Sequence, residues 1–229
     1  MTGEQPTDQS APSSVPEAPE SAAPPAAPSS PFSEQALELT PAAQRNIPVF
    51  DDLPIPPDTA NLREGPDLHP LCLPLLPLIG VWRGEGEVAY PTIGDPKHFG
   101  QQIIFAHDGR PFLSYTSQSW LLDGPGGSVV RPAARETGWW RPQEDDTIEV
   151  LIAHATGIIE VYYGQPRSTV SWEFVADAVV RTQTAKEVNA AQRLYGLIEG
   201  GDLAYVDERA MEGQPLQAHL SARLQRIAG

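Results

Sequence analysis

The stretch Gly80-Val81-Trp82-Arg83-Gly84-Glu85-Gly86-Glu87-Val88 decides the fold of this 229-residue chain. Apolar residues and glycines occupy its even positions, whereas the charged residues Arg83, Glu85 and Glu87 occupy odd positions. Successive side chains of a β-strand point to opposite faces, so this period of two predicts a half-buried strand whose charges face water.

Short apolar or alternating runs continue toward the C-terminus and predict further strands. They span residues 103–106, 112–121, 136–140, 147–153, 158–163, 169–175, 178–182, 188–198 and 202–211. Turn signals such as Asp108-Gly109 and Gly200-Gly201-Asp202 separate these runs. About ten short strands without intervening helices favour an all-β antiparallel meander, and closing it into an up-and-down barrel removes its exposed edges.

The last segment is ambiguous, because its apolar residues fit both a helix face and a strand face. The strand interpretation uses Leu216, Ala218, Leu220, Ala222 and Leu224. Barrel closure requires a strand here, and Gly213 and Pro215 interrupt any helix upstream, so we expect a strand that begins near His219.

A leucine-rich segment precedes the first strand. Residues 71–81 form the longest apolar run, but Pro74 and Pro77 prevent a long helix, so we expect a short turn that caps the core. The run is also too short to cross a bilayer. Cys72 lies in it and is interpreted as a small buried hydrophobe, since no neighbour would lower its pKa.

Composition divides the chain into a tail, residues 1–66, and a barrel domain, residues 67–229. The tail is acidic and rich in proline, with Arg45 and Arg63 as its only basic residues. Residues 1–31 lack the apolar side chains that offset the entropy of ordering, so we expect disorder there. Apolar residues between 32 and 66 allow partial ordering, although a loosely attached linker is the default expectation.

The charge balance excludes several functions. With 15 Lys and Arg against 30 Asp and Glu, the net charge is −15, which argues against nucleic acid and against anionic membranes. One cysteine cannot form an internal disulfide, and no Cys/His zinc spacing occurs. The first residues lack the basic and apolar regions of a signal peptide, so the cytoplasm is the expected location.

A barrel of about ten strands is wide enough to hold a ligand. Gly84 and Gly86 share a face with Trp82, and this arrangement has two readings. The glycines leave flat space for an apolar planar molecule, or they mark a bend or bulge in the barrel wall.

Among the five histidines, His219 differs from the others. His69, His98, His107 and His154 fall in loops or at strand ends, where surface or capping roles are expected. His219 lies between apolar residues just after a turn. Because no His-x-x-x-His or His-x-Glu spacing occurs, a multi-ligand metal site is not predicted, whereas a cofactor that needs one protein ligand, haem above all, remains open.

Several ordered motifs resemble the nitrobindin family over about residues 71–226. They are Gly80-Val81-Trp82-Arg83-Gly84-Glu85-Gly86, Tyr90-Pro91-Thr92-Ile93, Phe105-Ala106-His107, Arg110-Pro111-Phe112-Leu113, Glu136-Thr137-Gly138, the run from Ala153 to Glu160, Thr184-Ala185-Lys186-Glu187-Val188, and the run from Gly213 to Leu220. The resemblance implies a ten-stranded antiparallel barrel with one haem b per subunit at an open end and His219 as the single axial ligand of a five-coordinate iron.

The resemblance also implies further haem contacts and an activity. The contacts are Thr92, Lys186, Gly80, Trp82, Gly84 and Gly86. Thr92 has the alternative role of capping its own turn, and Lys186 that of an ordinary solvated residue. The implied activity is peroxynitrite isomerisation to nitrate by ferric haem with His219 in the catalytic position, together with nitric oxide binding. A homodimer is compatible with the sequence.

Two features bear on the chemistry of such a site. Apart from His219, the sequence indicates no barrel-facing histidine with an arginine partner, so peroxidase-type turnover of hydrogen peroxide is not predicted. The net charge repels an anionic substrate. Either the neutral acid reacts, or Lys186 and arginines such as Arg223 reverse the field locally.

Two alternatives of other classes remain open. The barrel is a carrier of a fatty acid or another apolar molecule, which explains the glycines and the closed sheet but not His219. Alternatively, the domain is a haem-based nitric oxide sensor whose tail signals to a partner.

Overall fold

The computed structural model describes residues 54–229, and ten strands form the body of this part of the chain. The strands are β1 (Gly80–Val88), β2 (Lys97–Ala106), β3 (Leu113–Leu122), β4 (Val129–Pro142), β5 (Ile148–His154), β6 (Ile158–Ser168), β7 (Ser171–Arg181), β8 (Val188–Leu197), β9 (Leu203–Met211) and β10 (Gln217–Ala228). A 3-10 helix, η2 (Pro70–Leu78), precedes them.

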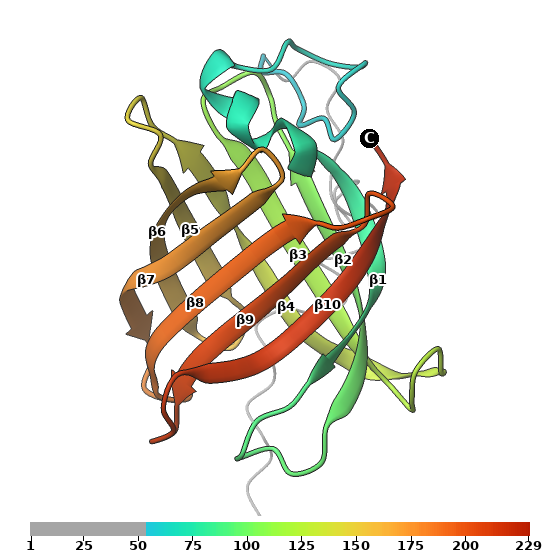
Figure 1. Cartoon of the computed structure of the whole chain (residues 1–229), viewed down its shortest axis with the longest axis vertical. Coiled ribbons are helices and arrows are strands. Elements are labelled where there is room, and N and C mark those ends of the chain that lie inside the picture. Colours follow the sequence, from blue (N-terminus) through green and yellow to red (C-terminus); the bar gives the residue numbers. More distant parts are fainter. Residues whose placement is uncertain (1–53) are drawn as a thin grey trace, which may run out of the picture. The chain divides into compact units, whose positions relative to one another are not determined.

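Every strand pairs antiparallel with its neighbours in sequence, and β10 pairs with β1 to close the barrel (Figure 1). The predicted all-β, ten-stranded up-and-down barrel is therefore confirmed. Closure removes most exposed sheet edges, although β7 and β8 pair only between residues 171–175 and 192–196. In residues 54–229, no helix is long and apolar enough to cross a membrane.

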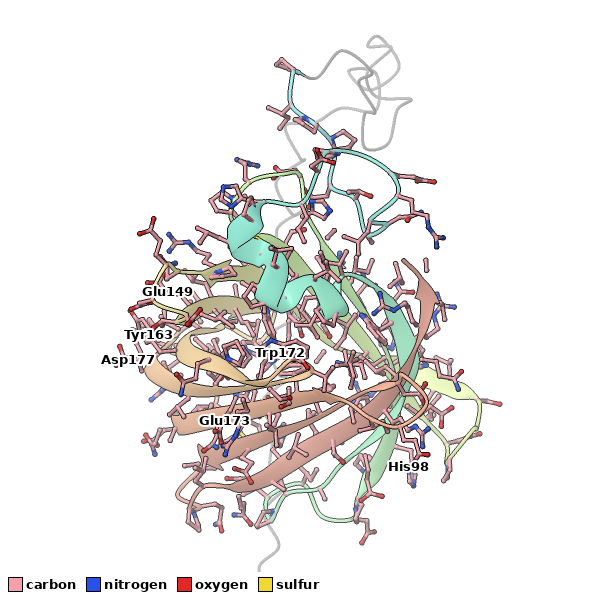
Figure 2. The ribbon with its side chains drawn as sticks, turned by 45° about the horizontal axis from the view of Figure 1, so that its top comes forward. His98, Glu149, Tyr163, Trp172, Glu173 and Asp177 are labelled. Carbon is pink, nitrogen blue, oxygen red and sulfur yellow. The ribbon has the colours of Figure 1, made fainter. Side chains whose placement is uncertain are left out.

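Several strands differ from their predicted bounds, and β6 continues to Ser168, beyond its predicted end at residue 163. Residues 169–175 and 178–182 belong to one strand, β7, because a bulge in its pairing with β6 interrupts the alternation without ending the strand. Strand β2 begins at Lys97, so His98 is a strand residue and not a loop residue (Figure 2). Strand β4 begins at Val129, in a stretch whose side chains are largely exposed and carry little apolar signal.

Helix η2 covers one end of the barrel, as the proline-rich sequence predicted (Figure 1). Two tryptophans fasten it: Trp82 Nε1 donates to the Leu78 carbonyl at 2.7 Å, and Trp172, which lies beneath η2 in Figure 2, donates to the Pro74 carbonyl at 3.0 Å. Cys72 is fully buried on the inner side of η2, as predicted. His69, expected to be exposed, is half-buried and caps η2 by accepting a hydrogen bond from the Leu71 N–H.

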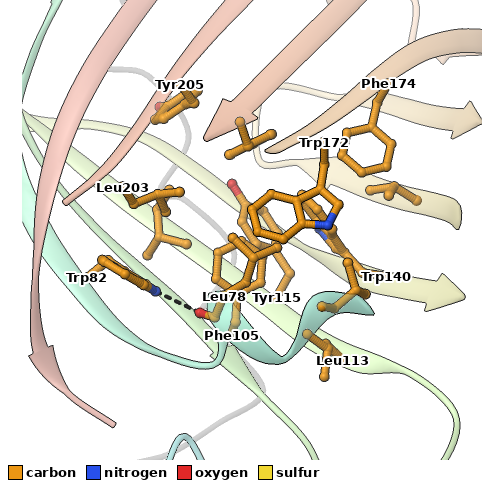
Figure 3. Packing of buried hydrophobic residues seen from close by; sticks show 14 of the residues in the cluster. Leu78, Trp82, Phe105, Leu113, Tyr115, Trp140, Trp172, Phe174, Leu203 and Tyr205 are labelled. Carbon is orange, nitrogen blue, oxygen red and sulfur yellow. Dashed lines mark hydrogen bonds between the residues drawn. The ribbon is translucent and has the colours of Figure 1, made fainter. Parts of the chain in front are cut away.

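Aromatic side chains fill the barrel interior next to η2 (Figure 3). Trp140 is central, and its ring meets Phe105, Phe174 and Tyr195 edge-on at centroid distances of 5.1, 4.7 and 5.2 Å. Edge-to-face contacts of this kind stabilise beyond the apolar area that they bury. This half of the barrel is thus a packed core and not a ligand cavity.

Part of the segment assigned to the tail is attached to the barrel. Thr59 and His107 form an antiparallel bridge with backbone hydrogen bonds of 2.8 and 2.9 Å, and Ser114 donates to the Asp58 carboxylate. His107, expected near the surface, is buried by this bridge. The attached segment therefore begins before residue 67, whereas the disorder expected for residues 1–31 lies outside the described residues.

Gly84 and Gly86 allow close packing in the wall of the barrel. A Cβ atom at Gly84 would lie 2.2 Å from the Arg223 carbonyl oxygen of β10, and one at Gly86 would lie 2.6 Å from the Phe99 ring. The space beside these glycines is occupied by the neighbouring strand and side chain. The register of β1 is regular at Gly84 and Gly86, so the predicted bend or bulge is absent there too, and the glycines instead permit a close approach within the wall.

Replacing Gly84 by alanine tests this reading. Gly84→Ala forces β1 away from the β10 backbone, and an overpacking cost of about 1–3 kcal/mol lowers the melting temperature of the full chain by several degrees. Gly196→Ala is the matched control, because its added Cβ has no neighbour closer than 3.8 Å. Equal melting temperatures for the two variants, measured by circular dichroism, would contradict the close-approach reading.

Candidate functional site

A β-bulge in β10 positions His219. Ala218 pairs with Glu208 of β9 and Leu220 pairs with Asp207, so His219 is the extra residue between them. A bulge re-aims side chains, and here Leu220 and His219 both line the same internal cavity although they are consecutive. Without the bulge, strict alternation would place them on opposite faces.

The His219 ring is half-buried and held on one side by Tyr90. The two rings meet edge-on at a centroid distance of 5.6 Å and an angle of 81°. Tyr90 is fixed in turn, because its hydroxyl accepts from the Met211 N–H at 2.9 Å and donates to the Arg209 carbonyl at 3.0 Å. The segment after β1 is thereby fastened to the end of β9, and the His219 ring has a defined orientation.

The two nitrogens of His219 differ in their surroundings. Nδ1 is buried and lacks a hydrogen-bond partner, whereas Nε2 is not one of the buried atoms that lack a partner. Burial lowers the pKa of His219 below its usual value, and the opposing effect of Asp207 is smaller. The imidazole is therefore neutral at pH 7, with a lone pair available to a metal.

A cavity of about 190 Å³ lies beside His219. Leu220 pairs with Val88 at the end of β1, whereas η2 precedes the start of β1, so this is the barrel end opposite η2. Its apolar lining includes Val88, Phe99, Leu121 and Leu220, and its polar lining includes Gln101, Ser117, Glu136, Arg193, Tyr205 and Asp207. Several of these polar groups are paired with one another: Gln101 donates to Ser117 at 2.9 Å and accepts from Tyr205 at 2.7 Å. The cavity is thus polar on one side and apolar on the other.

A buried network of charges adjoins this cavity. Arg193 donates to both carboxylate oxygens of Glu136, at 3.1 and 3.0 Å, and Arg209 donates to both oxygens of Glu160, at 2.6 and 3.3 Å. Asp207 lies between the two arginines. Buried charges persist only when they are paired in this way, and the bidentate geometry is the strongest form of such pairing.

His154 belongs to the same network, which corrects two expectations. Its Nδ1 lies 3.3 Å from Glu136 and its Nε2 lies 2.7 Å from Glu160. His154 is therefore not a surface or capping residue. It is also a barrel-facing histidine that shares its carboxylate partners with Arg193 and Arg209, so the expectation that no such histidine exists was wrong.

The pKa values of these carboxyl groups reflect their partners. Burial alone would raise the pKa of Glu136, but the Arg193 guanidinium and His154 outweigh burial and lower the pKa to about 2. Glu160 behaves in the same way, because its bond to His154 and the charge of Arg209 outweigh burial and hold its pKa well below the usual range. Both carboxyl groups are therefore ionised at pH 7.

Thr92 and Lys186 meet at the rim of the same end. Both bind one carboxylate oxygen of Glu212, Thr92 through its hydroxyl at 2.6 Å and Lys186 through its ammonium at 2.9 Å. Three connections converge here: those between β1 and β2, between β7 and β8, and between β9 and β10. The structure thus brings together two of the predicted contact residues around a carboxylate.

The four remaining predicted contact residues lie elsewhere. Gly80 and Trp82 pair near the end of β10, and Trp82 is opposite Arg226, roughly 20 Å along the strand from His219. Trp82 is buried against η2, and Gly84 and Gly86 do not line the cavity beside His219. A haem contact by these four residues stays a prediction that their placement does not support.

The fold has known relatives. A family model described as the THAP4-like, heme-binding beta-barrel domain matches residues 71–226. The chain belongs to this family. The nitrobindin resemblance is thereby confirmed, since the relatives include proteins of that name.

Two relatives and one solved structure illustrate the similarity. A ferric nitrobindin-like protein of Saccharopolyspora erythraea is 57% identical over 185 residues, which cover 81% of this chain and 87% of that protein. A peroxynitrite isomerase of Mycobacteroides abscessus is 52% identical over 201 residues, which cover 85% and 97%. The crystal structure of Rv2717c from M. tuberculosis has a TM-score of 0.62 at 37% identity and covers 70% of this chain and 99% of that one.

The residues present fit the haem of this family of barrels. His219 offers a neutral imidazole whose Nε2 is not enclosed. The pairing of Thr92 and Lys186 with Glu212 demonstrates that this part of the rim accommodates a carboxylate, the group that each haem propionate carries.

Sequence reasoning missed Tyr90 as a contact of His219, Glu212 as the partner of Thr92 and Lys186, and the charge network. A signal for the network was present in the sequence. In β8, Arg193 alternates in step with the apolar residues Ala191 and Tyr195. In β9, Asp207 and Arg209 alternate in step with Tyr205 and Met211. Alternation alone therefore places these charges on the inner face of the barrel.

The network makes stability depend on pH. Because the folded-state pKa of Glu136 is depressed, its contribution is complete above the unfolded pKa of about 4.3 and is lost as the pH falls toward about 2. We expect the free energy of unfolding, measured with urea, to fall by a few kcal/mol over that window. In Glu136→Gln the value at pH 7 is lower and the decline is shallower.

Glu149→Gln is the control for this prediction. It removes a carboxylate from a more exposed pair, Arg141 and Glu149 at 2.7 Å, and should keep the wild-type dependence on pH. Identical pH profiles for Glu136→Gln and Glu149→Gln would show that the buried network does not set the acid limit of stability.

Proposed function

We propose that this protein is a ferric haem protein that isomerises peroxynitrite to nitrate. The observation that carries the proposal is the inward turn of His219 at the bulge, which gives the barrel one neutral, half-buried imidazole beside a cavity. The family description supports haem as the cofactor, and relatives that are 52–55% identical are named peroxynitrite isomerase.

In this proposal His219 holds the iron through Nε2, and Thr92 and Lys186 hold a propionate. Propionate binding requires them to exchange the Glu212 carboxylate for that of the haem. The haem is of the b type, held without covalent attachment. The only cysteine, Cys72, is buried within η2 at the other end of the barrel and cannot form a thioether with the haem.

Ferric haem, when bound, supplies an iron at which the O–O bond of peroxynitrite can break and rearrange to nitrate. The chain supplies the remaining conditions. Tyr90 orients His219, and the apolar lining of the cavity, from Val88 to Leu121, limits water at this end. Each of the three buried carboxylates contacts one of the two arginines, which reduces the negative charge that an anionic substrate meets.

The form of the substrate follows from the pairing of the nearby cations. Lys186 pairs with Glu212 at 2.9 Å, and Arg223 pairs with Asp202 at 2.7 Å on the exposed side of β10. Neither residue is therefore a free positive charge that offsets the repulsion between this acidic chain and an anionic substrate. This pairing favours entry of the neutral acid form of peroxynitrite.

The proposal also covers a second ligand, the location of the protein and its oligomeric state. Nitric oxide binds the same iron as a neutral ligand that the charges do not repel. The protein acts in the cytoplasm, which its free, buried Cys72 suits.

The protein forms a homodimer through the outer face of β8, β9, β10 and β1. A groove of about 830 Å³ on this face carries Leu194 and both acidic and basic residues, as a self-complementary interface requires.

The apolar-carrier alternative does not suit the lining of the described part of the barrel. The half beneath η2 is filled around Trp140, and the cavity beside His219 is bordered by buried charges such as Arg193 and Asp207, which an acyl chain cannot pair with. A long acyl chain would have to displace packed aromatic rings. The sensor alternative depends on the tail, residues 1–66, of which only residues 54–66 are described.

Replacing His219 tests the proposed ligand. Haem added to the full-length wild type should give a Soret band and should speed the loss of peroxynitrite with a matching yield of nitrate. In His219→Ala the band should shift or collapse, and the acceleration should fall at least tenfold. His98→Ala is the control, because His98 lies on β2 away from the cavity lining. Equal haem spectra for His219→Ala and wild type would refute the assignment.

The two lysines of the chain, Lys97 and Lys186, allow a matched test of the rim. Lys186→Met removes the proposed propionate partner, so haem should dissociate several-fold faster, measured by transfer to a haem-scavenging globin. Lys97→Met removes an exposed positive charge at the start of β2 and should leave the rate unchanged. Equal dissociation rates for the two variants would remove Lys186 from the site.

A further inference from the structure

Asp207 and His219 are neighbours across the β9–β10 ladder. Asp207 pairs with Leu220, and the bulge sets His219 directly beside that pair. Asp207 is buried, and its side chain lines the cavity of about 190 Å³ that His219 also lines. The two side chains therefore face one common space inside the barrel.

Each of the two residues has a buried polar atom without a hydrogen bond. The atoms are Nδ1 of His219 and Oδ1 of Asp207. Oδ1 lies 2.8 Å from Arg209 Nε, which is the distance of an ion pair, but the geometry is not that of a hydrogen bond. A buried polar group without a partner is costly, so native proteins pair such atoms directly or through ordered water.

The two unpartnered atoms are chemically complementary. A neutral imidazole can carry its hydrogen on Nδ1 and donate it, and a carboxylate oxygen can only accept. The cavity that both residues line is polar on this side and large enough for several water molecules. A single water can accept from Nδ1 and donate to Oδ1, which satisfies both atoms at once.

Two arginines fix Asp207 in position. Arg209 Nη2 donates to Asp207 Oδ2 at 3.1 Å, and Arg193 Nε lies 3.1 Å from the same oxygen. Both arginines are held in turn by Glu160 and Glu136. The carboxylate of Asp207 is therefore a rigid acceptor, anchored by the network in the wall of the cavity that His219 also lines.

We propose that Asp207 is the positioning residue of His219: its carboxylate accepts the Nδ1 hydrogen through a water in the shared cavity. This fixes the imidazole as the Nδ1–H tautomer and leaves the Nε2 lone pair for the haem iron. Ligating histidines commonly donate their second nitrogen to a carboxylate or a water, and this contact increases their basicity. The proposal deepens the proposed function and rests on it for the role of Nε2.

The tautomer of His219 tests the proposal in haem-free, full-length protein. Nitrogen-15 chemical shifts at pH 8 should show the hydrogen on Nδ1 in the wild type. Asp207→Asn should shift the population toward the Nε2–H tautomer, because the amide is a weaker acceptor than the carboxylate. Glu160→Gln is the matched control: it removes a carboxylate from the same network, but Glu160 does not line the cavity. It should keep the wild-type tautomer.

A second measurement uses the haem-loaded protein. A less basic imidazole in Asp207→Asn should lower the iron–histidine stretching frequency of the ferrous form and raise the midpoint potential of the haem, while Glu160→Gln stays near the wild type. Identical shifts in both variants would indicate a general effect of lost charge and overturn the positioning role.

The outcomes separate this proposal from the proposed function. A wild type that carries its hydrogen on Nε2 overturns the role of Asp207 even if haem binds, and this result stands if Asp207→Asn fails to fold. A wild type that carries the hydrogen on Nδ1 but binds no haem overturns the proposed function and leaves the contact to Asp207 intact.

Discussion

One extra residue in β10 is the constraint on which the site depends. The register of β10 against β1 runs without interruption from Arg226 to Leu220, but against β9 it slips by one residue between Ala218 and Leu220. The strand therefore satisfies two neighbours only with a bulge at His219. This bulge turns the imidazole into the barrel beside Leu220 and next to Asp207, which creates the geometry of a single-ligand site.

The two halves of the barrel interior are filled differently, one by aromatic packing and the other by paired charges beside a cavity. Beneath η2, aromatic rings around Trp140 fill the space and leave no room for a ligand. Toward the other end, paired charges replace aromatic packing and a cavity opens. Buried charge networks are costly compared with apolar packing, so their presence beside His219 points to a role in the site rather than in stability alone.

Much of the fold could be predicted from the sequence, and less of the site. The period of two in residues 80–88 identified the first strand, and the prolines near Cys72 indicated the cap. The inward turn of His219 follows from the register between two strands, which no local pattern encodes. The meeting of Thr92 and Lys186 at Glu212 depends on three connections that converge in space, and it lies equally beyond local reasoning.

The central claim is that the bulge presents His219 to haem inside the barrel, at the end opposite η2. The most direct measurement is a crystal structure of the full-length protein with haem, in which anomalous scattering at the iron edge locates the metal. The account predicts one iron peak at bonding distance from His219 Nε2, beside the cavity that Asp207 lines. An iron peak on the outer face of the barrel, or at another side chain, would contradict it.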